Sequence, residues 1–380
     1  MAKYDLVLKG GHVVDPVQAI DGPMDVAFLS GKVAAIDRNI AVPPGVEARD
    51  VTGHYVTPGL IDMHTHVYWG GTSLGIDAEE FCRTSAVTTA IDTGSAGPGN
   101  FAGFRKHVIE PSQVRILAFL HVSHAGIFGF SNRIMVGESE DLRLMDPQTA
   151  VEVALANRDL IVGIKVRLGK WASGIHGMSP FEHAIQVADE TGLPLMVHID
   201  EPPPSYAEVV ERLRPGDVLT HCFRPFPNTP VTPDGKVRPE VLAARQRGVL
   251  FDIGHGMGSF SFKVARIMLN NGFYPDTISS DVHALCINGP AFDQVTTLSK
   301  FLNLGMSFPE VIRTTTENAA LALSRPDIGN LKPGSIGDVA ILSVDEGEFN
   351  YVDVVGETLA GDKKVNVQGV VLAGGWWHPT

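Results

Sequence analysis

The feature that most constrains the fold is an alternation of apolar runs with helix-length segments through the middle of the chain. Such alternation is typical of parallel βαβ units. Eight units match a TIM barrel, whose usual length of about 250 residues agrees with the stretch from about 57 to 325. We expect the eight strands at 60–63, 88–92, 114–122, 160–166, 193–198, 217–221, 249–253 and 277–281.

The helices between these strands have recognisable ends. In the segment after the fourth strand, Ser179 can cap a helix, Pro180 favours its first position and Gly192 favours its end. The segment therefore predicts a helix over 180–191 with Ser179 as its N-cap.

Both ends of the chain consist of short strands without helix-length segments. At the start these are 6–8, 12–14, 26–29 and 33–36, and at the end 338–342, 365–367 and 368–373. Neither end has enough residues to build a core alone. We therefore expect an α/β protein: a (β/α)8 TIM barrel over 57–328, with a small β-sandwich formed from 1–56 and 329–380.

Composition narrows the class of partner. The net charge of −13 and the lack of a basic stripe argue against nucleic acid and anionic membranes. Three scattered cysteines give no disulfide framework, and no apolar run approaches 18 residues. We expect a cytoplasmic homo-oligomer that acts on a small molecule.

Several polar residues stand at the ends of the expected strands. With about 30 residues to each βα unit, their spacing places them on strands 1, 4, 5, 6 and 8. The carboxyl ends of barrel strands form the face that carries active sites. We therefore expect one site built from His64, His66, Lys165, His198, His221 and Asp281.

These residue types point to a metal. Several imidazoles with a carboxylate suit a divalent ion of intermediate softness, zinc before others. His64 and His66 point to one face because alternate residues of a strand do so. A lone His-x-His pair seldom binds metal, and a lone histidine is more often a core residue. The prediction therefore depends on the combined spacing.

Lys165 does not fit a simple ligand set, because an ammonium group repels a cation. It is either a salt-bridged structural residue or a chemically altered one. A lysine amine that reacts with carbon dioxide becomes a carbamate, and this anion can bridge two metals. Burial and nearby cations favour the neutral amine that this reaction needs.

Residues 57–66, TPGLIDMHTH, resemble the strand-1 signature of the amidohydrolase superfamily, and 330–339 resemble its return strand. The resemblance covers nearly the whole chain. It implies two divalent ions, most plausibly Zn²⁺: one bound by His64, His66 and Asp281, the other by His198 and His221, with carboxylated Lys165 as a bridge. A hydroxide between the ions would then attack an amide or ester carbonyl, with Asp281 as general base.

Within the superfamily, the chain is most similar to the deacetylases often labelled dihydroorotase-like, on the evidence of 163–167 and 280–283. That group removes acyl groups from small carboxylates, such as acetylated 2-hydroxy acids or N-acyl amino acids. The alternative is a cyclic amide hydrolase of the dihydroorotase or hydantoinase type. A dihydroorotase usually has an arginine shortly after its His-x-His pair, and 67–73 contain none.

Two more distant alternatives share the fold. A non-catalytic scaffold would have lost metal ligands, whereas this chain keeps all six positions. A mononuclear deaminase would not need Lys165 and usually has a glutamate beside its strand-5 or strand-6 histidines. Residues 198–201, HIDE, give only a loose likeness to that pattern.

Four further residues are candidates for substrate contact. Arg167 shares the face of Lys165 and could clamp a carboxylate, although a structural salt bridge is an equal alternative. His283 shares the face of Asp281. His255 lies in a glycine-rich loop that suggests close backbone approach or a lid, or simply a tight turn. Asn100 lies in the loop after strand 2, where packing is the alternative.

Overall fold

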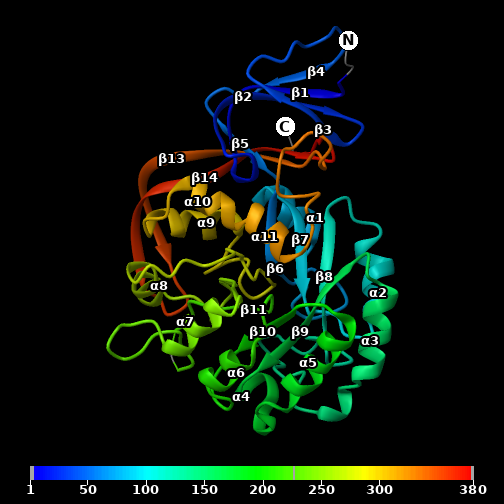
Figure 1. Ribbon diagram of the computed structural model, residues 1–380, viewed down its shortest axis with the longest axis vertical. Coiled ribbons are helices and arrows are strands. Elements are labelled where there is room, and N and C mark those ends of the chain that lie inside the picture. Colours follow the sequence, from blue (N-terminus) through cyan, green and yellow to red (C-terminus); the bar gives the residue numbers. More distant parts are fainter. Residues whose placement is uncertain (1–3, 226, 378–380) are drawn as a thin grey trace.

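The central element is a curled sheet of seven parallel strands. In the computed structural model, which describes residues 4–225 and 227–377, its order is β12-β11-β10-β9-β8-β7-β6 (Figure 1). These strands are β6 Leu60–Thr65, β7 Val87–Thr93, β8 Arg115–His121, β9 Ile161–Leu168, β10 Leu195–Ile199, β11 Val218–Leu219 and β12 Leu250–Phe251. Sequential order and parallel pairing throughout are the topology expected of βαβ units. The first seven expected strands are all present, although β11 and β12 are short.

The expected eighth strand, 277–281, is not regular. Residues 277–282 instead close the sheet through two parallel bridges, Asp252 to Thr277 on one side and Thr65 to Val282 on the other. Asp281 has a φ of 48°, which interrupts the pleat of a strand. The segment therefore occupies the position of strand 8 with a backbone that a strand cannot have.

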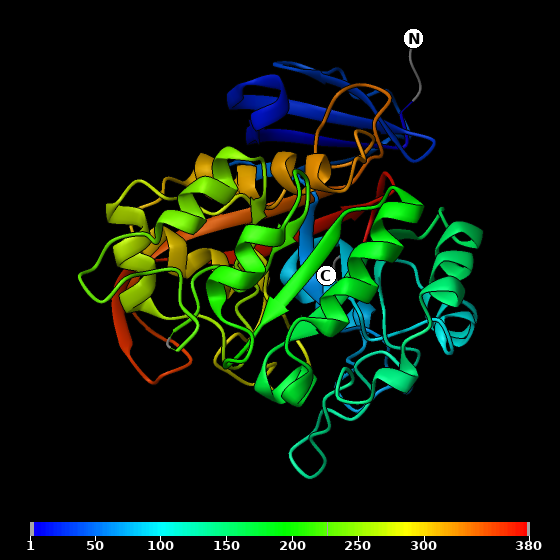
Figure 2. The same ribbon diagram turned by 60° about the horizontal axis from the view of Figure 1, so that its bottom comes forward.

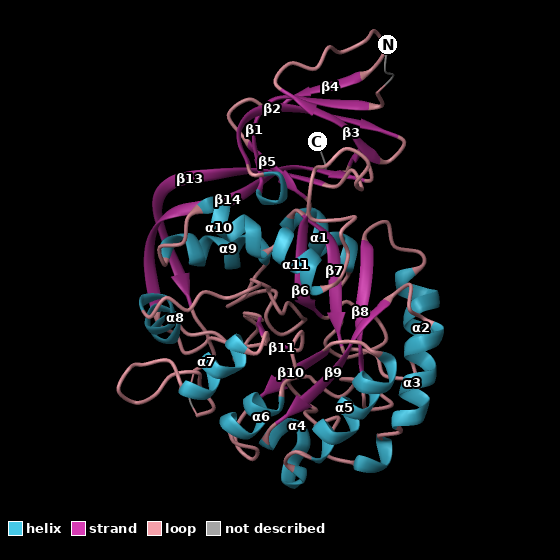
Figure 3. Ribbon diagram, in the orientation of Figure 1, coloured by secondary structure: helices cyan, strands magenta, loops and turns pink. Residues whose placement is uncertain are grey.

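Helices surround the outside of the parallel sheet (Figure 3). The α-helices are α1 Ala78–Ser85, α2 Phe101–Phe104, α3 Pro147–Ala156, α4 Lys170–Ser173, α5 Ser179–Thr191, α6 Tyr206–Arg212, α7 Pro239–Gln246, α8 Phe262–Asn270, α9 Gln294–Asn303, α10 Phe308–Thr314 and α11 Glu317–Ala322. Helical segments of 3-10 type are η1 Pro16–Gln18, η3 Leu142–Leu144 and η4 Gly174–His176, and η2 Arg105–Ile109 is a π-helix.

Helix α5 confirms the predicted helix after the fourth strand and corrects its start. Gly192 ends it in the left-handed conformation, as expected. The N-cap, however, is Met178, which makes no side-chain cap hydrogen bond, and Ser179 is the first helical residue. The predicted Ser179 cap was therefore wrong by one position.

A second sheet joins the two ends of the chain. Its order is β15-β14-β13-β5-β1-β2-β3, with β4 also paired to β1. The strands are β1 Leu6–Asp15, β2 Ile20–Leu29, β3 Lys32–Asp37, β4 Glu47–Asp50, β5 Tyr55–Pro58, β13 Val339–Val352, β14 Thr358–Leu372 and β15 Gly375–Trp376. Figure 2 shows the first strands as a separate layer, and in Figure 1 β13 and β14 lie between these strands and helices α9 and α10. This sheet confirms that both ends build one unit.

Strand β5 makes the connection. It pairs in antiparallel fashion with β13 and in parallel with β1. The separate strands expected at 6–8 and 12–14 are one strand, β1, with a register shift between Leu8 and Gly11. Gly10 has a φ of 73°, so the two glycines bend the strand without ending it. The pieces expected at 365–367 and 368–373 are likewise parts of β14.

Alternation along β9 separates the core from the site. Ile164 and Val166 belong to the main apolar cluster, together with Phe181 of α5. Lys165 and Arg167, which alternate with them along the strand, point the other way because successive strand residues face opposite sides. Packing of α5 therefore fixes the direction of both polar side chains.

Among the described residues, no helix is long and apolar enough to cross a membrane.

Candidate active site

A cavity of about 360 Å³ opens at the carboxyl ends of the parallel strands. All six residues predicted to form one site line it, so the structure brings them together as expected. Its lining comprises His64, His66, Leu74, Ile127, Phe130, Met135, Lys165, Arg167, Trp171, His198, Asp200, His221, Arg224, Met257, Gly258, Ser259, Asp281 and His283.

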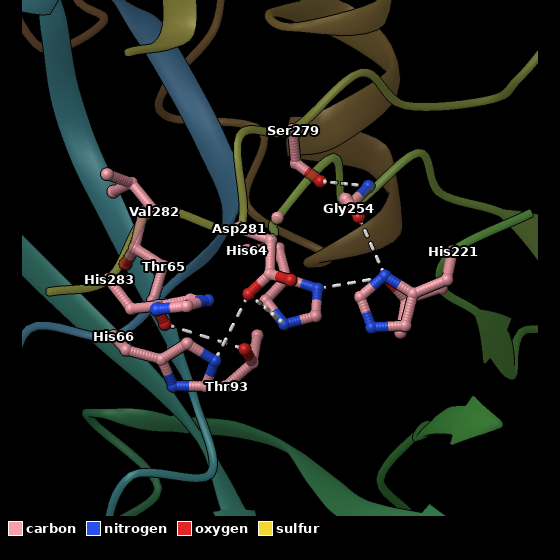
Figure 4. A network of polar contacts seen from close by, with 12 residues as sticks. His64, Thr65, His66, Thr93, His221, Gly254, Ser279, Asp281, Val282 and His283 are labelled. Carbon is pink, nitrogen blue, oxygen red and sulfur yellow. Dashed lines mark hydrogen bonds and ion pairs between the residues drawn. The ribbon is translucent and has the colours of Figure 1, made fainter. Parts of the chain in front are cut away.

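Two histidines of strand β6 and its end converge on one carboxylate. Asp281 Oδ1 lies 3.3 Å from His64 Nε2 and 3.2 Å from His66 Nε2. In Figure 4 the carboxylate points between the two rings. One ligand atom from each of the three buried residues lies within 4.8 Å of the others, which suits a single metal ion.

A buried hydrogen-bond relay fixes the His64 ring. Thr220 Oγ1 donates to Asp252 Oδ2 at 2.8 Å, so it accepts from His64 Nδ1, also at 2.8 Å. Thr277 and Ser279 donate to the same carboxylate. With its proton on Nδ1, His64 keeps the Nε2 lone pair directed at the cavity. A metal-binding histidine needs this tautomer.

The His221 ring is fixed by the backbone. Its Nδ1 lies 2.7 Å from the carbonyl oxygen of Gly254, a contact drawn in Figure 4. Because a carbonyl can only accept, Nδ1 carries the proton and Nε2 keeps a lone pair. The His198 and His221 rings lie edge to face, with centroids 4.5 Å apart. These two rings form a second possible set of nitrogen ligands.

Unusual backbone conformations position His221 and Asp281. Their φ angles are 63° and 48°, a region that costs a non-glycine residue about 1–2 kcal/mol. Two glycines allow the close packing around them. A Cβ on Gly254 would lie 2.7 Å from His221 Nδ1, and one on Gly256 would lie 2.2 Å from Asp281 Oδ2. The glycines of this loop therefore allow its backbone to approach candidate ligands closely. The sequence alone did not distinguish this close approach from a lid.

Lys165 is fully buried and its Nζ has no hydrogen-bond partner among the described residues. It forms no salt bridge there either, which removes the structural alternative weighed from the sequence. His198 Nε2 and Asp200 Oδ2, also in the cavity, lack hydrogen-bond partners in the same way. Buried polar atoms without partners are costly, so the atoms of this cluster are suited to bind an ion or a polar ligand.

Burial sets the protonation of the site. It lowers the pKa of His64, His198 and His221 well below the ordinary histidine value, so all three are neutral at pH 7. Burial also lowers the pKa of Lys165 to about 7 and raises the pKa of Asp281 to about 6. Neutral imidazoles and an available amine are what a metal centre with a modified lysine requires. These residues fit divalent metal ions.

The structure divides the four predicted substrate contacts into two pairs. Arg167 and His283 line the cavity. His255 does not: it is buried with its Nε2 2.7 Å from Lys300 Nζ and its ring stacked on Phe260. Since its neighbours hold it away from the cavity, its placement corrects the expected substrate contact.

Asn100 also lies outside the cavity lining. Its Oδ1 accepts from the Gly97 backbone at 2.9 Å, and its Nδ2 donates to the Ala125 carbonyl at 2.9 Å. These bonds join two loops and use both ends of the amide. The packing alternative therefore describes Asn100, and the expected substrate contact is corrected here too.

Several residues of the site were missed from the sequence. Asp62 accepts from the Ser280 backbone at 3.0 Å and so holds the segment that carries Asp281. Asp252 anchors the relay to His64. Both stand inside expected strands, where a buried carboxylate needs a hydrogen-bond partner. That requirement could have identified them from the sequence as residues that support the site. Arg224 lines the cavity from the turn after β11. Its position three residues after His221 gave no signal without the geometry of the turn.

A curled parallel sheet with a His–His–Asp cluster at its strand ends defines a TIM-barrel protein with a site of metal-ligand type. Comparisons with known proteins agree. A model of the Amidohydrolase family matches residues 258–376. A protein named deacetylase from Brucella anthropi is 37% identical over 357 residues, which cover 94% of this chain and 88% of that relative.

Two solved structures have the same fold over the whole chain. The crystal structure of an adenine deaminase has a TM-score of 0.92 and 29% identity, covering 99% of this chain and 100% of its own. The crystal structure of a dihydroorotase has a TM-score of 0.91 and 32% identity, covering 99% of each chain. The chain belongs to the amidohydrolase superfamily of hydrolases.

Proposed function

We propose that the protein is a binuclear zinc deacylase that removes an acyl group from a small carboxylate, such as an acetylated 2-hydroxy acid or an N-acyl amino acid. The observation that carries this proposal is the convergence of the six predicted ligand residues on one cavity. The relative named deacetylase, similar over nearly the whole chain, supports the choice of reaction.

The donor atoms divide into two groups. His64, His66 and Asp281 would hold one ion, since their ligand atoms lie within 4.8 Å of one another. His198 and His221 would hold the second. Lys165, as a carbamate, would bridge the two, and its buried unpartnered amine supports that modification. Bound divalent ions would polarise the substrate carbonyl and acidify the attacking water.

Asp281 is the residue placed to move a proton. Its Oδ1 contacts His64 of β6 and His66 just after it, while its carboxylate lies at the cavity wall. It would accept the proton of the attacking water and deliver it to the departing oxygen or nitrogen. Burial of Asp281, 7% exposed, keeps bulk water from competing for this proton. Arg167 and His283 would form part of the wall that the substrate packs against.

Cyclic amide hydrolysis and deamination are the competing reactions, suggested by the solved structures named dihydroorotase and adenine deaminase. The cavity favours an anionic substrate over adenine, because the buried guanidinium of Arg224 lines it. No arginine stands at 67–73, where a dihydroorotase usually has one for its carboxylate. These observations support a linear acylated carboxylate as the substrate, in preference to a cyclic amide or adenine.

We also propose limits for the parts of the chain. Residues 57–328 would form the hydrolase domain, and 1–56 with 329–380 a β-sandwich around the apolar cluster that contains Val13, Phe28 and Val339. The acidic charge of −13 supports a protein without nucleic acid or anionic membrane partners, and the three free cysteines support a cytoplasmic site of action.

A substrate panel tests the reaction. We expect the zinc-loaded enzyme to hydrolyse acetylated 2-hydroxy acids or N-acyl amino acids, and to leave dihydroorotate, hydantoins and adenine unchanged. Release of acetate and of ammonia would be measured separately, so that deacylation and deamination give different products. Turnover of adenine or dihydroorotate at a higher kcat/KM than every acylated carboxylate would contradict the proposal.

Two metal ions should be bound to each chain. Because the donors form two groups around Lys165, we expect about two divalent ions per chain after expression with zinc and bicarbonate. Elemental analysis of the purified protein measures this ratio. His198→Ala should reduce it to about one, whereas a variant at the exposed Lys106 should not change it. Full activity with one ion would contradict the binuclear site.

A further inference from the structure

Two arginines line the cavity, and they differ in the charged groups that surround their guanidinium groups. Arg167 belongs to β9, and Arg224 to the turn that follows β11. Their exposed fractions are 8% and 7%, so each guanidinium group is largely removed from water. A buried charge is costly unless an opposite charge or hydrogen bonds compensate it. The compensation of each arginine therefore indicates its role.

Arg167 has an internal counter-charge. Its Nη1 lies 3.6 Å from Glu138 Oε2, and its guanidinium lies over the Phe130 ring, 4.9 Å from the centroid. Glu138 is itself buried and also lies 3.2 Å from His121 Nε2. Arg167 and Glu138 thus form a nearly neutral ion pair beside the cavity, although Arg167 Nε, like Arg224 Nε, makes no hydrogen bond.

Arg224 has no such partner. Among the residues that the structure describes, no carboxylate lies within 4.0 Å of its guanidinium, and Nε and Nη1 make no hydrogen bond. Asp200, the cavity carboxylate that also lacks a hydrogen bond on Oδ2, lies beyond that distance and is 3.9 Å from His198 Nε2. Arg224 therefore presents to the cavity a positive charge that forms no direct ion pair with a described carboxylate.

The turn holds Arg224 in a fixed position relative to His221. The Arg224 backbone N–H donates to the His221 carbonyl at 3.1 Å, and Thr229 Oγ1 donates to the Arg224 carbonyl at 3.1 Å. Between them Phe223 is completely buried. The candidate metal ligand and the guanidinium are thus presented to one cavity by a single rigid turn.

We propose that Arg224 is the specificity-determining residue of the site: it binds the carboxylate of the substrate, while the Arg167–Glu138 pair shapes the wall without selecting charge. The inference rests on the proposed function for the identity of the acyl substrate. Its charge requirement is independent of the reaction, because any anion that fits the cavity would satisfy Arg224. Charge-assisted hydrogen bonds to a carboxylate would use its unpartnered N–H groups.

Binding of two matched probes tests this assignment. Calorimetry would compare 2-hydroxyhexanoate with its neutral amide, 2-hydroxyhexanamide, on the zinc-loaded protein, and the ratio of the two Kd values measures selection of charge. We expect Arg224→Gln to reduce this ratio by about tenfold or more, as loss of a charge-assisted hydrogen bond does. Arg224→Lys should recover part of it. Any contact of the carboxylate with the metals remains in both variants.

The matched control neutralises the other arginine together with its partner. Arg167→Gln combined with Glu138→Gln should keep the ratio near that of the unaltered protein. Thermal unfolding supplies a second readout: Arg224→Gln should keep or raise Tm, because it removes a buried charge that forms no direct ion pair with a described carboxylate. An unchanged ratio in Arg224→Gln, its loss in the double variant, or unfolding of Arg224→Gln would each overturn the assignment.

The two proposals can fail separately. If no acylated carboxylate is hydrolysed but Arg224→Gln loses the preference for the anion, the proposed reaction is wrong and the role of Arg224 stands. If acylated carboxylates are hydrolysed and Arg224→Gln keeps the full preference, the reaction stands and another group recognises the carboxylate.

Discussion

Replacing Lys165 with alanine is expected to abolish hydrolysis and to release metal from the protein. The amine of Lys165 is fully buried and has no hydrogen-bond partner among the described residues, so nothing in the fold itself uses its charge. As a carbamate it would supply the anion shared by both metals. Without that anion, bound divalent ions would lose the ligand that Lys165 would supply to both, and we expect kcat below the limit of detection. Steady-state kinetics and elemental analysis of the same preparation measure both effects.

Chemical rescue separates a bridging role from a structural one. Lys165→Ala leaves a void where the side chain was, and a short carboxylic acid such as propionate can enter it and bridge the metals. Lys165→Met fills the same volume and should not respond to the acid. Acid-dependent recovery in the alanine variant alone would support the carbamate. Substantial activity of Lys165→Ala without added acid would show that Lys165 has no catalytic use.

Most of the site residues that could be predicted from the sequence stand at the ends of strands. His64, His66, Lys165 and His198 stand in regular strands or directly after one, and the structure places all four on one cavity. Spacing along the chain sufficed because each βα unit has a similar length and all strands of the sheet run in one direction. Residues placed by this repeat are predictable without knowledge of the loops.

His221 and Asp281 were located correctly, but their conformations could not have been predicted. Both have positive φ angles and lie outside regular strands. Gly254 and Gly256 make room for them across the sheet, so the conformation depends on a contact between segments far apart in the chain. A regular strand over 277–281 was the natural expectation from apolar pattern alone, and Asp281 is the residue that prevents it.

Loop residues were predicted least well, for a related reason. Asn100 and His255 have residue types common in binding sites, yet their hydrogen bonds join them to Ala125 and Lys300 instead of directing them at the cavity. Arg224 was overlooked because only the fold of its turn brings it beside His221. The partners of loop side chains are set by tertiary packing, and neither spacing nor periodicity encodes that packing.

Asp281→Asn should reduce kcat by about 10²- to 10⁴-fold while the metals stay bound, which is the usual contribution of a general base. Asparagine keeps the size of the side chain and one carbonyl oxygen for the metal, but it cannot accept a proton. It also suits the backbone, since Asn and Asp are the non-glycine residues that most readily adopt the left-handed φ of 48° found here. The variant therefore separates proton transfer from folding and from coordination.

Two controls accompany Asp281→Asn: the metal content of the variant, and a matched variant at His283, which lines the same cavity. Two ions per chain with a large fall in kcat would assign the proton transfer to Asp281, whereas loss of one ion would show that coordination itself had failed. His283→Gln is the matched variant, because His283 lines the same cavity two residues further on. If Asp281→Asn with both metals loses less than tenfold in kcat and His283→Gln loses far more, the proton is transferred by His283. Burial lowers the pKa of His283 to about 4, so its ring is neutral at pH 7 and able to take that part.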